Sequence, residues 1–143
     1  MSIVSRAPRT AVPRTIGRLT LGAILVFAGV THLTVARKEF RAQVPPWLPL
    51  KPDVVVVASG IVEISLGGAL LLLGPWRVPI GWLTAAFFVA IFPGNIAQYV
   101  EHRDGVGLDT DAKRLARLPF QVPLVLGALW STAAWRDRRR LRA

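Results

Sequence analysis

The chain has 143 residues, of which 52% are hydrophobic and 18% are charged, and its formal net charge is +10. Because the charges lie between long apolar runs, this composition indicates a membrane protein and argues against a soluble domain. The basic residues flank the apolar segments and form no stripe interleaved with aromatic side chains, which argues against nucleic-acid binding. The lack of cysteine excludes a disulfide, a thiol pair and a cysteine-bound iron–sulfur cluster, and the two histidines are too distant in sequence to suggest a metal site.

The apolar pattern predicts an all-α integral membrane protein, an antiparallel four-helix bundle. We expect a basic cytoplasmic tail over residues 1–15, a transmembrane domain over residues 16–136, and a second basic cytoplasmic tail over residues 137–143. The four expected spans are approximately residues 16–36, 54–73, 79–100 and 119–136.

The first span follows basic residues and could be taken for a secretory signal, but it is long for one and three comparable segments follow it. His32 is the only ionisable residue in its second half, where a lone histidine is more often an interfacial residue than a ligand. The connection over residues 37–53 contains four prolines, which exclude a regular helix across its second half. Trp47 in this connection favours the membrane interface, so the loop is suited to cover one end of the bundle.

The second span carries a carboxylate, Glu63, near its middle. A central acidic side chain costs on the order of 3 kcal/mol on insertion scales, so Glu63 should face protein and avoid lipid. Ser59, Glu63 and Gly67 recur every four residues, and Gly60 and Gly67 are seven apart, which lets another helix approach closely. Glu63 could therefore make a structural interhelical hydrogen bond or belong to a functional site.

Residues 74–78 are too few for anything but a tight turn, so the second and third spans should be neighbours. Pro93 and Gly94 are expected to bend or loosen the third span beside Asn95. Residues 101–118 form a polar loop whose end can become a short helix approaching the membrane. The fourth span has Gln121 in its first turns, directly after Arg117.

The distribution of Lys and Arg around the spans places both termini in the cytoplasm, in a multi-pass protein of the cell membrane. In this topology four polar residues reach a similar height in the outer half of the bundle, above the deeper Glu63. Because buried polar groups need partners, one shared polar cavity is predicted, although depth alone leaves the rotational phase of each helix open. The members of this candidate binding cavity are His32, Glu63, Asn95, Arg117 and Gln121.

Five sequence stretches resemble the DoxX-like family of small membrane proteins, which includes subunits associated with thiosulfate:quinone oxidoreductase. They are AGVTHL with His32, VPPWLP, SGIVEI with Glu63, FPGNIAQ with Asn95, and RLPFQVPL with Arg117 and Gln121. The resemblance covers about residues 19–135 and implies a four-helix membrane bundle more firmly than a reaction. It carries over no catalytic residue, and this chain has no cysteine for the thiol chemistry suggested for relatives.

Three functions are compatible with these features. The first is an accessory or assembly subunit of a membrane complex, which contacts another membrane protein or a second copy of itself through its small-residue faces. The second is a membrane subunit linked to a redox system that binds a quinone or lipid with the polar groups on its head. The third is a small transporter. The sequence favours a protein that is not an enzyme on its own, identifies no catalytic residue or metal ligand, requires no cofactor, and leaves the ligand unidentified.

Overall fold

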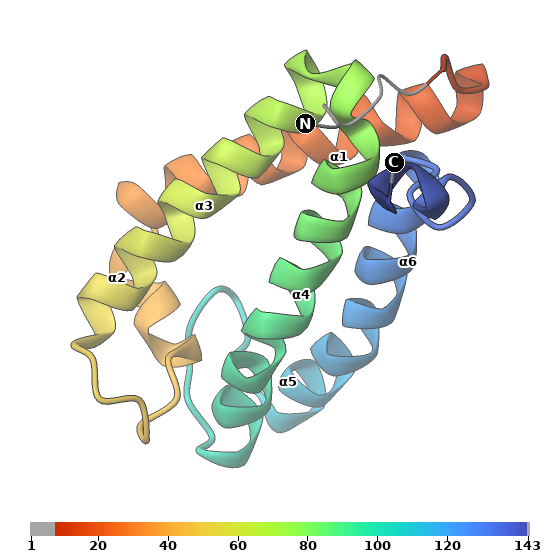
Figure 1. Ribbon diagram of the computed structural model, residues 1–143. Coiled ribbons are helices and arrows are strands. Elements are labelled where there is room, and N and C mark those ends of the chain that lie inside the picture. Colours follow the sequence, from red (N-terminus) through yellow and green to blue (C-terminus); the bar gives the residue numbers. More distant parts are fainter. Residues whose placement is uncertain (1–7, 143) are drawn as a thin grey trace.

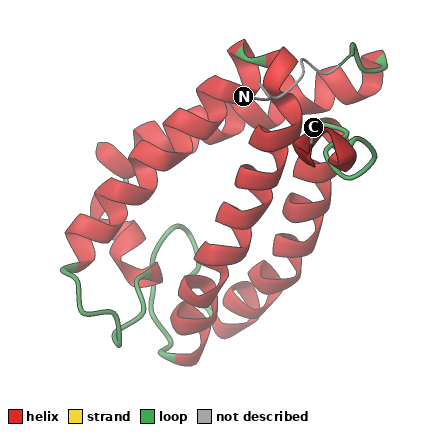
Figure 2. Ribbon diagram, in the orientation of Figure 1, coloured by secondary structure: helices red, strands yellow, loops and turns green. Residues whose placement is uncertain are grey.

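The computed structural model describes residues 8–142, and the regular elements in this range are all helical (Figure 1, Figure 2). The longer helices are α1 (Val12–Leu33), α3 (Pro52–Leu72), α4 (Arg77–Val100) and α6 (Gln121–Ser131). The shorter elements are α2 (Arg37–Phe40), α5 (Asp111–Arg117) and the 3₁₀ turns η1 (Arg41–Gln43), η2 (Gly74–Trp76), η3 (Leu118–Phe120) and η4 (Arg138–Arg142). The predicted all-α class is confirmed for this part of the chain.

Three helices are long and apolar enough to cross a membrane: α1, α3 and α4 with its preceding turn. They correspond to the first three predicted spans. Helix α1 begins at Val12 and not at residue 16, because Pro13 takes a first-turn position in which a missing N–H costs no hydrogen bond. Helix α1 ends at Leu33 and not at residue 36. Helix α4 continues through Pro93 to Val100.

The fourth predicted span differs most from the structure. Helix α6 has 11 residues, about 16 Å by the rise per residue, and it ends at Ser131 and not at residue 136. Ala133 adopts a left-handed conformation with φ 52°, and the Ala134 N–H donates to the Leu129 carbonyl at 2.9 Å. This is the geometry that commonly terminates helices, and a pattern of apolar residues does not reveal it. At its other end α6 continues directly from α5 and η3, so the helical run covers residues 111–131.

The longer helices form two antiparallel pairs, since α1 packs mainly against α3 and α4 mainly against α6. In Figure 1 the two pairs meet near the turn that joins α3 to α4 and diverge toward the opposite end, where α2 and the two long loops lie. A buried core of Leu25, Leu70, Ile80, Phe88 and Ala128 connects all four helices. The structure thus has a closed end, and an end at which loops lie between the helix pairs.

Glycine pairs explain the close contact of α1 and α3. A Cβ at Gly29 would stand 2.6 Å from the Gly60 carbonyl oxygen, and a Cβ at Gly67 would stand 2.6 Å from the Gly22 carbonyl oxygen. Both distances are too short for any side chain, so the backbones touch at two levels. The predicted close approach at the small residues beside Glu63 is therefore confirmed, and the helix that approaches is α1.

The closed end is held by the buried guanidinium of Arg77. Its Nη2 atom donates to Asp137 Oδ2 at 2.8 Å and to the Pro8 carbonyl at 2.9 Å, and Nη1 donates to the Thr132 carbonyl. These contacts bring the segment before α1, the start of α4 and the segment after α6 to the same end of the molecule.

Candidate functional site

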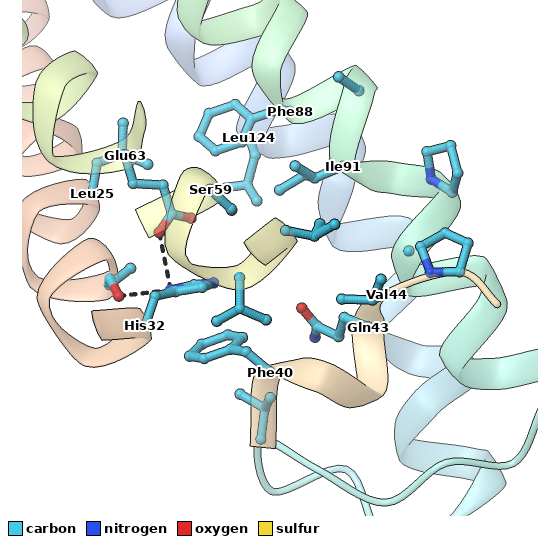
Figure 3. Close-up of a pocket in the computed structure, with 18 of the residues that line it drawn as sticks. Leu25, His32, Phe40, Gln43, Val44, Ser59, Glu63, Phe88, Ile91 and Leu124 are labelled. Carbon is cyan, nitrogen blue, oxygen red and sulfur yellow. Dashed lines mark hydrogen bonds and ion pairs between the residues drawn. The ribbon is translucent and has the colours of Figure 1, made fainter. Parts of the chain in front are cut away.

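A pocket of about 390 Å³ lies between the two helix pairs, in the half of the molecule that contains the long loops. This volume falls within the roughly 300–1,000 Å³ typical of small-molecule sites. Its walls are mostly apolar and come from α1, α3, α4 and α6, with Leu25, Phe88, Ile91 and Leu124 among them (Figure 3). The polar side chains that line it are few: His32, Gln43, Ser59, Glu63 and Arg117. An apolar cavity with a small polar end is suited to an amphipathic small molecule.

Glu63 and His32 form the buried polar end of this pocket. Glu63 lies in the middle of α3 and is directed toward α1, and the side chains of His32 and Glu63 are 9% and 7% exposed. His32 Nδ1 donates to the Ala28 carbonyl at 2.7 Å and lies 3.0 Å from Glu63 Oε2. The prediction that Glu63 faces protein is confirmed, and the partner on α1 is the one ionisable residue in its second half.

The proton on His32 Nδ1 is directed to Ala28, and Glu63 Oε2 consequently has no hydrogen-bond partner among the described residues. A buried oxygen of this kind costs free energy until a donor reaches it. Figure 3 shows the other ring nitrogen of His32 directed into the pocket. The polar end of the pocket therefore offers hydrogen-bonding capacity that the protein itself does not use.

The segment between α1 and α3 closes one side of the pocket. The ring of Phe40, in α2, stacks on the His32 ring with centroids 3.4 Å apart and an interplanar angle of 16°. Val44 and Pro45 are buried against the helices. The loop that the sequence predicts as a cover for one end of the bundle supplies part of the pocket wall.

This covering segment is held against α4 by polar contacts. Gln43 Nε2 donates to Gln98 Oε1 at 3.1 Å, and Arg103 Nη1 donates to the Val44 carbonyl at 2.9 Å. Gly94 is required at this contact, because a Cβ there would collide with the Gln43 carbonyl oxygen. Gln98 is 1% exposed and also donates to the Arg103 and Gly105 carbonyls, so it joins both long loops to α4.

The five residues of the predicted polar cavity are placed in three ways. His32, Glu63 and Arg117 line the pocket. Gln121 is buried beside it, accepting a hydrogen bond from Arg117 Nη1 at 3.3 Å and donating to the Phe88 carbonyl. Asn95 is buried without lining the pocket, and its Nδ2 atom has no partner among the described residues. Binding at these residues stays a prediction.

Sequence reasoning did not identify Phe40, Gln43 and Gln98 as site residues. Phe40 and Gln43 lie in the connection that the sequence predicts to cover one end of the bundle. Nothing in the pattern of this connection shows which of its side chains point into the pocket. Gln98 stood within the FPGNIAQ stretch, and its spacing from Gly94 could have drawn attention, because residues four apart share a helix face. Over residues 8–142, no group of three His, Asp or Glu side chains is arranged to hold a metal ion.

Comparison with known proteins gives one finding. A family model described as a domain of unknown function (DUF8561) matches residues 21–132. No curated protein and no solved structure matches the chain. The matched range contains the whole of α3 and α4 and each of His32, Glu63, Asn95, Arg117 and Gln121. Because it covers well over half of the chain, the protein belongs to the DUF8561 family, whose description assigns no function.

Proposed function

We propose that this protein is a multi-pass membrane protein that binds a small lipophilic molecule with a polar head, such as a quinone or a lipid, in the pocket between its helix pairs. The observation that carries the proposal is the buried His32–Glu63 pair, in which Glu63 lies at the middle of an apolar helix and His32 at the end of its neighbour, both facing an apolar cavity of about 390 Å³. Ionisable groups inside membrane helices are rare and typically functional. Here the pair stands at the end of a cavity large enough for a ligand.

The proposal includes four membrane crossings with both termini in the cytoplasm. Three helices qualify by length and hydropathy, and three crossings would put the chain ends on opposite sides. Pro8 and Asp137 nevertheless share the guanidinium of Arg77. A fourth crossing by the helical run over residues 111–131 reconciles the two observations. The resemblance to DoxX-like proteins supports the same four-helix arrangement.

The alternative of an accessory or assembly subunit depended on small-residue faces open to a partner. Gly22, Gly29, Gly60 and Gly67 are instead used within the chain, in the contact of α1 with α3. This use of the glycines favours the ligand-binding proposal over the accessory role. A transporter would use Glu63 as a titrating group, and no observation in this fold favours that role over binding.

Replacing Glu63 by Gln tests the binding proposal. Glu63→Gln keeps the shape of the side chain and removes its charge, so we expect the variant to fold and to lose at least roughly tenfold in bound lipophilic ligand, since a hydrogen bond to a charged group contributes about 1.5–3 kcal/mol. The measurement is native mass spectrometry and organic extraction of the protein purified in mild detergent. Glu101→Gln, at an exposed site just after α4, is the matched control and should leave the bound species unchanged. Equal occupancy in the wild type and in Glu63→Gln would contradict the proposal.

A further inference from the structure

The polar end of the pocket presents hydrogen-bond acceptors. In a neutral imidazole with its proton on Nδ1, the other ring nitrogen is an acceptor, and this nitrogen is directed into the pocket (Figure 3). Glu63 Oε2 is an acceptor without a partner in a side chain that is 7% exposed. Two acceptors therefore lie near each other. The protein donor beside Oε2, His32 Nδ1 at 3.0 Å, directs its proton to the Ala28 carbonyl, so a ligand that carries a donor completes the site.

A hydroxyl group fits both protonation states of Glu63. When Glu63 is ionised, a ligand hydroxyl donates to the carboxylate. When Glu63 is protonated, its O–H donates to the hydroxyl oxygen, and the ligand hydroxyl can still donate to the imidazole nitrogen or to the carbonyl oxygen of the acid. A carbonyl or an ether can only accept, so it is matched in one of these states and leaves the acceptors unpaired in the other.

The remaining wall of the pocket argues against a cationic head and for an apolar body. Arg117 lines the same cavity, so a ligand ammonium group would meet a like charge. Beyond the polar end the lining is aliphatic and aromatic, including Leu25, Val56 and Phe88. We infer that, within the lipophilic molecules with a polar head, the ligand is an alcohol or phenol and not a quinone. Its hydroxyl group binds between Glu63 and His32, and its apolar body extends toward Phe88 and Leu124.

This inference rests on the proposed function and specifies the chemical class of its ligand. A matched set of probes separates the two: para-octylphenol, its methyl ether, and the corresponding para-octyl acetophenone. They share the same apolar chain and differ in hydrogen bonding, since the phenol donates and the others only accept. Binding is followed by tryptophan fluorescence of the full chain in lipid nanodiscs, where Trp47 lines the pocket. Partitioning into empty nanodiscs is subtracted for each probe.

We expect the phenol to bind the wild-type protein at least roughly tenfold more tightly than the ether and the acetophenone, because these leave a buried acceptor unpaired. Glu63→Gln replaces one carboxylate oxygen by an amide donor, which can donate to the carbonyl of the acetophenone. In this variant the affinity for the phenol should therefore exceed the affinity for the acetophenone by less than about threefold. Ser65→Ala, on an exposed face of α3, should leave all three affinities unchanged. Equal binding of the three probes to the wild type would overturn the inference and leave the proposed function standing. Saturable binding of none of them would overturn both.

Discussion

Buried polar side chains at the two ends of this molecule differ in how completely they are paired. Arg77 donates to Thr132, Pro8 and Asp137, so the guanidinium has partners on three segments. Glu63, equally buried, keeps an oxygen without a partner beside His32. A buried group with all its partners stabilises a fold, whereas one that lacks them is suited to bind something else. This contrast assigns a structural role to Arg77 and leaves Glu63 available for a ligand.

The pairing of Asp137 predicts a pH dependence of stability. Hydrogen bonds from Arg136, and then from Arg77, lower the pKa of Asp137 to about 2. Since the pKa of Asp in unfolded chains is about 3.9, the stabilisation is fully present above that pH and is lost as the pH falls toward the folded-state value. We expect the thermal unfolding temperature of the wild type in detergent to fall more steeply than that of Asp137→Asn across this acidic window.

The comparison needs a control because other carboxylates titrate in the same window. Glu101→Gln removes an exposed carboxylate that makes no ion pair within the described part of the chain, so its acid profile should follow the wild type. If Asp137→Asn also followed the wild type at every pH, the ion pairs of Asp137 with Arg77 and Arg136 would contribute nothing to the closed end.

At the scale of the helices, the glycine contacts between α1 and α3 can be tested by one added methyl group. In Gly29→Ala the new Cβ would stand 2.6 Å from both the Gly60 carbonyl oxygen and Ile64 Cγ1, so the helices must separate. Overpacking of this kind typically costs about 1–3 kcal/mol. We expect a corresponding loss in the free energy of unfolding, measured by denaturant titration in a fixed detergent.

Gly68→Ala is the matched control on α3, because a Cβ at that position has no neighbouring atom within 4 Å. It should be neutral or stabilising by up to about 1 kcal/mol, since alanine favours a helix over glycine. Equal destabilisation by the two substitutions would show that the contact of α1 with α3 at Gly29 does not determine the result.

The helices themselves were largely predictable from the sequence, whereas their rotation was not. Apolar runs identify α1, α3 and α4, and a central carboxylate among small residues indicates which face of α3 is buried. Depth alone grouped Asn95 with His32 and Glu63, yet Asn95 does not line their pocket. Its side-chain direction depends on the rotation of α4 about its axis, which no pattern within α4 specifies. The inward turn of Phe40 and Gln43 was equally hidden, because it depends on tertiary contacts of a proline-rich loop.

At the scale of the whole molecule, the position of the chain ends predicts a labelling pattern. The native chain has no cysteine, so single introduced thiols report cleanly on sidedness. Leu141→Cys lies at the closed end and Thr110→Cys at the opposite end, and both native side chains are exposed. In intact cells an impermeant thiol reagent should modify the cysteine at position 110 and leave the one at position 141 unmodified. The reverse pattern would invert the proposed orientation, and modification of both would remove the fourth crossing.

The pairing of α1 with α3 also bears on how the protein is made. Glu63 is the most difficult side chain to place in lipid, and its neighbour His32 has already been synthesised when α3 leaves the ribosome. The glycines that join the two helices likewise all precede α4 in the chain. We therefore expect α1 and α3 to enter the bilayer as a finished hairpin, so that the translocon never has to release the carboxylate-bearing helix alone.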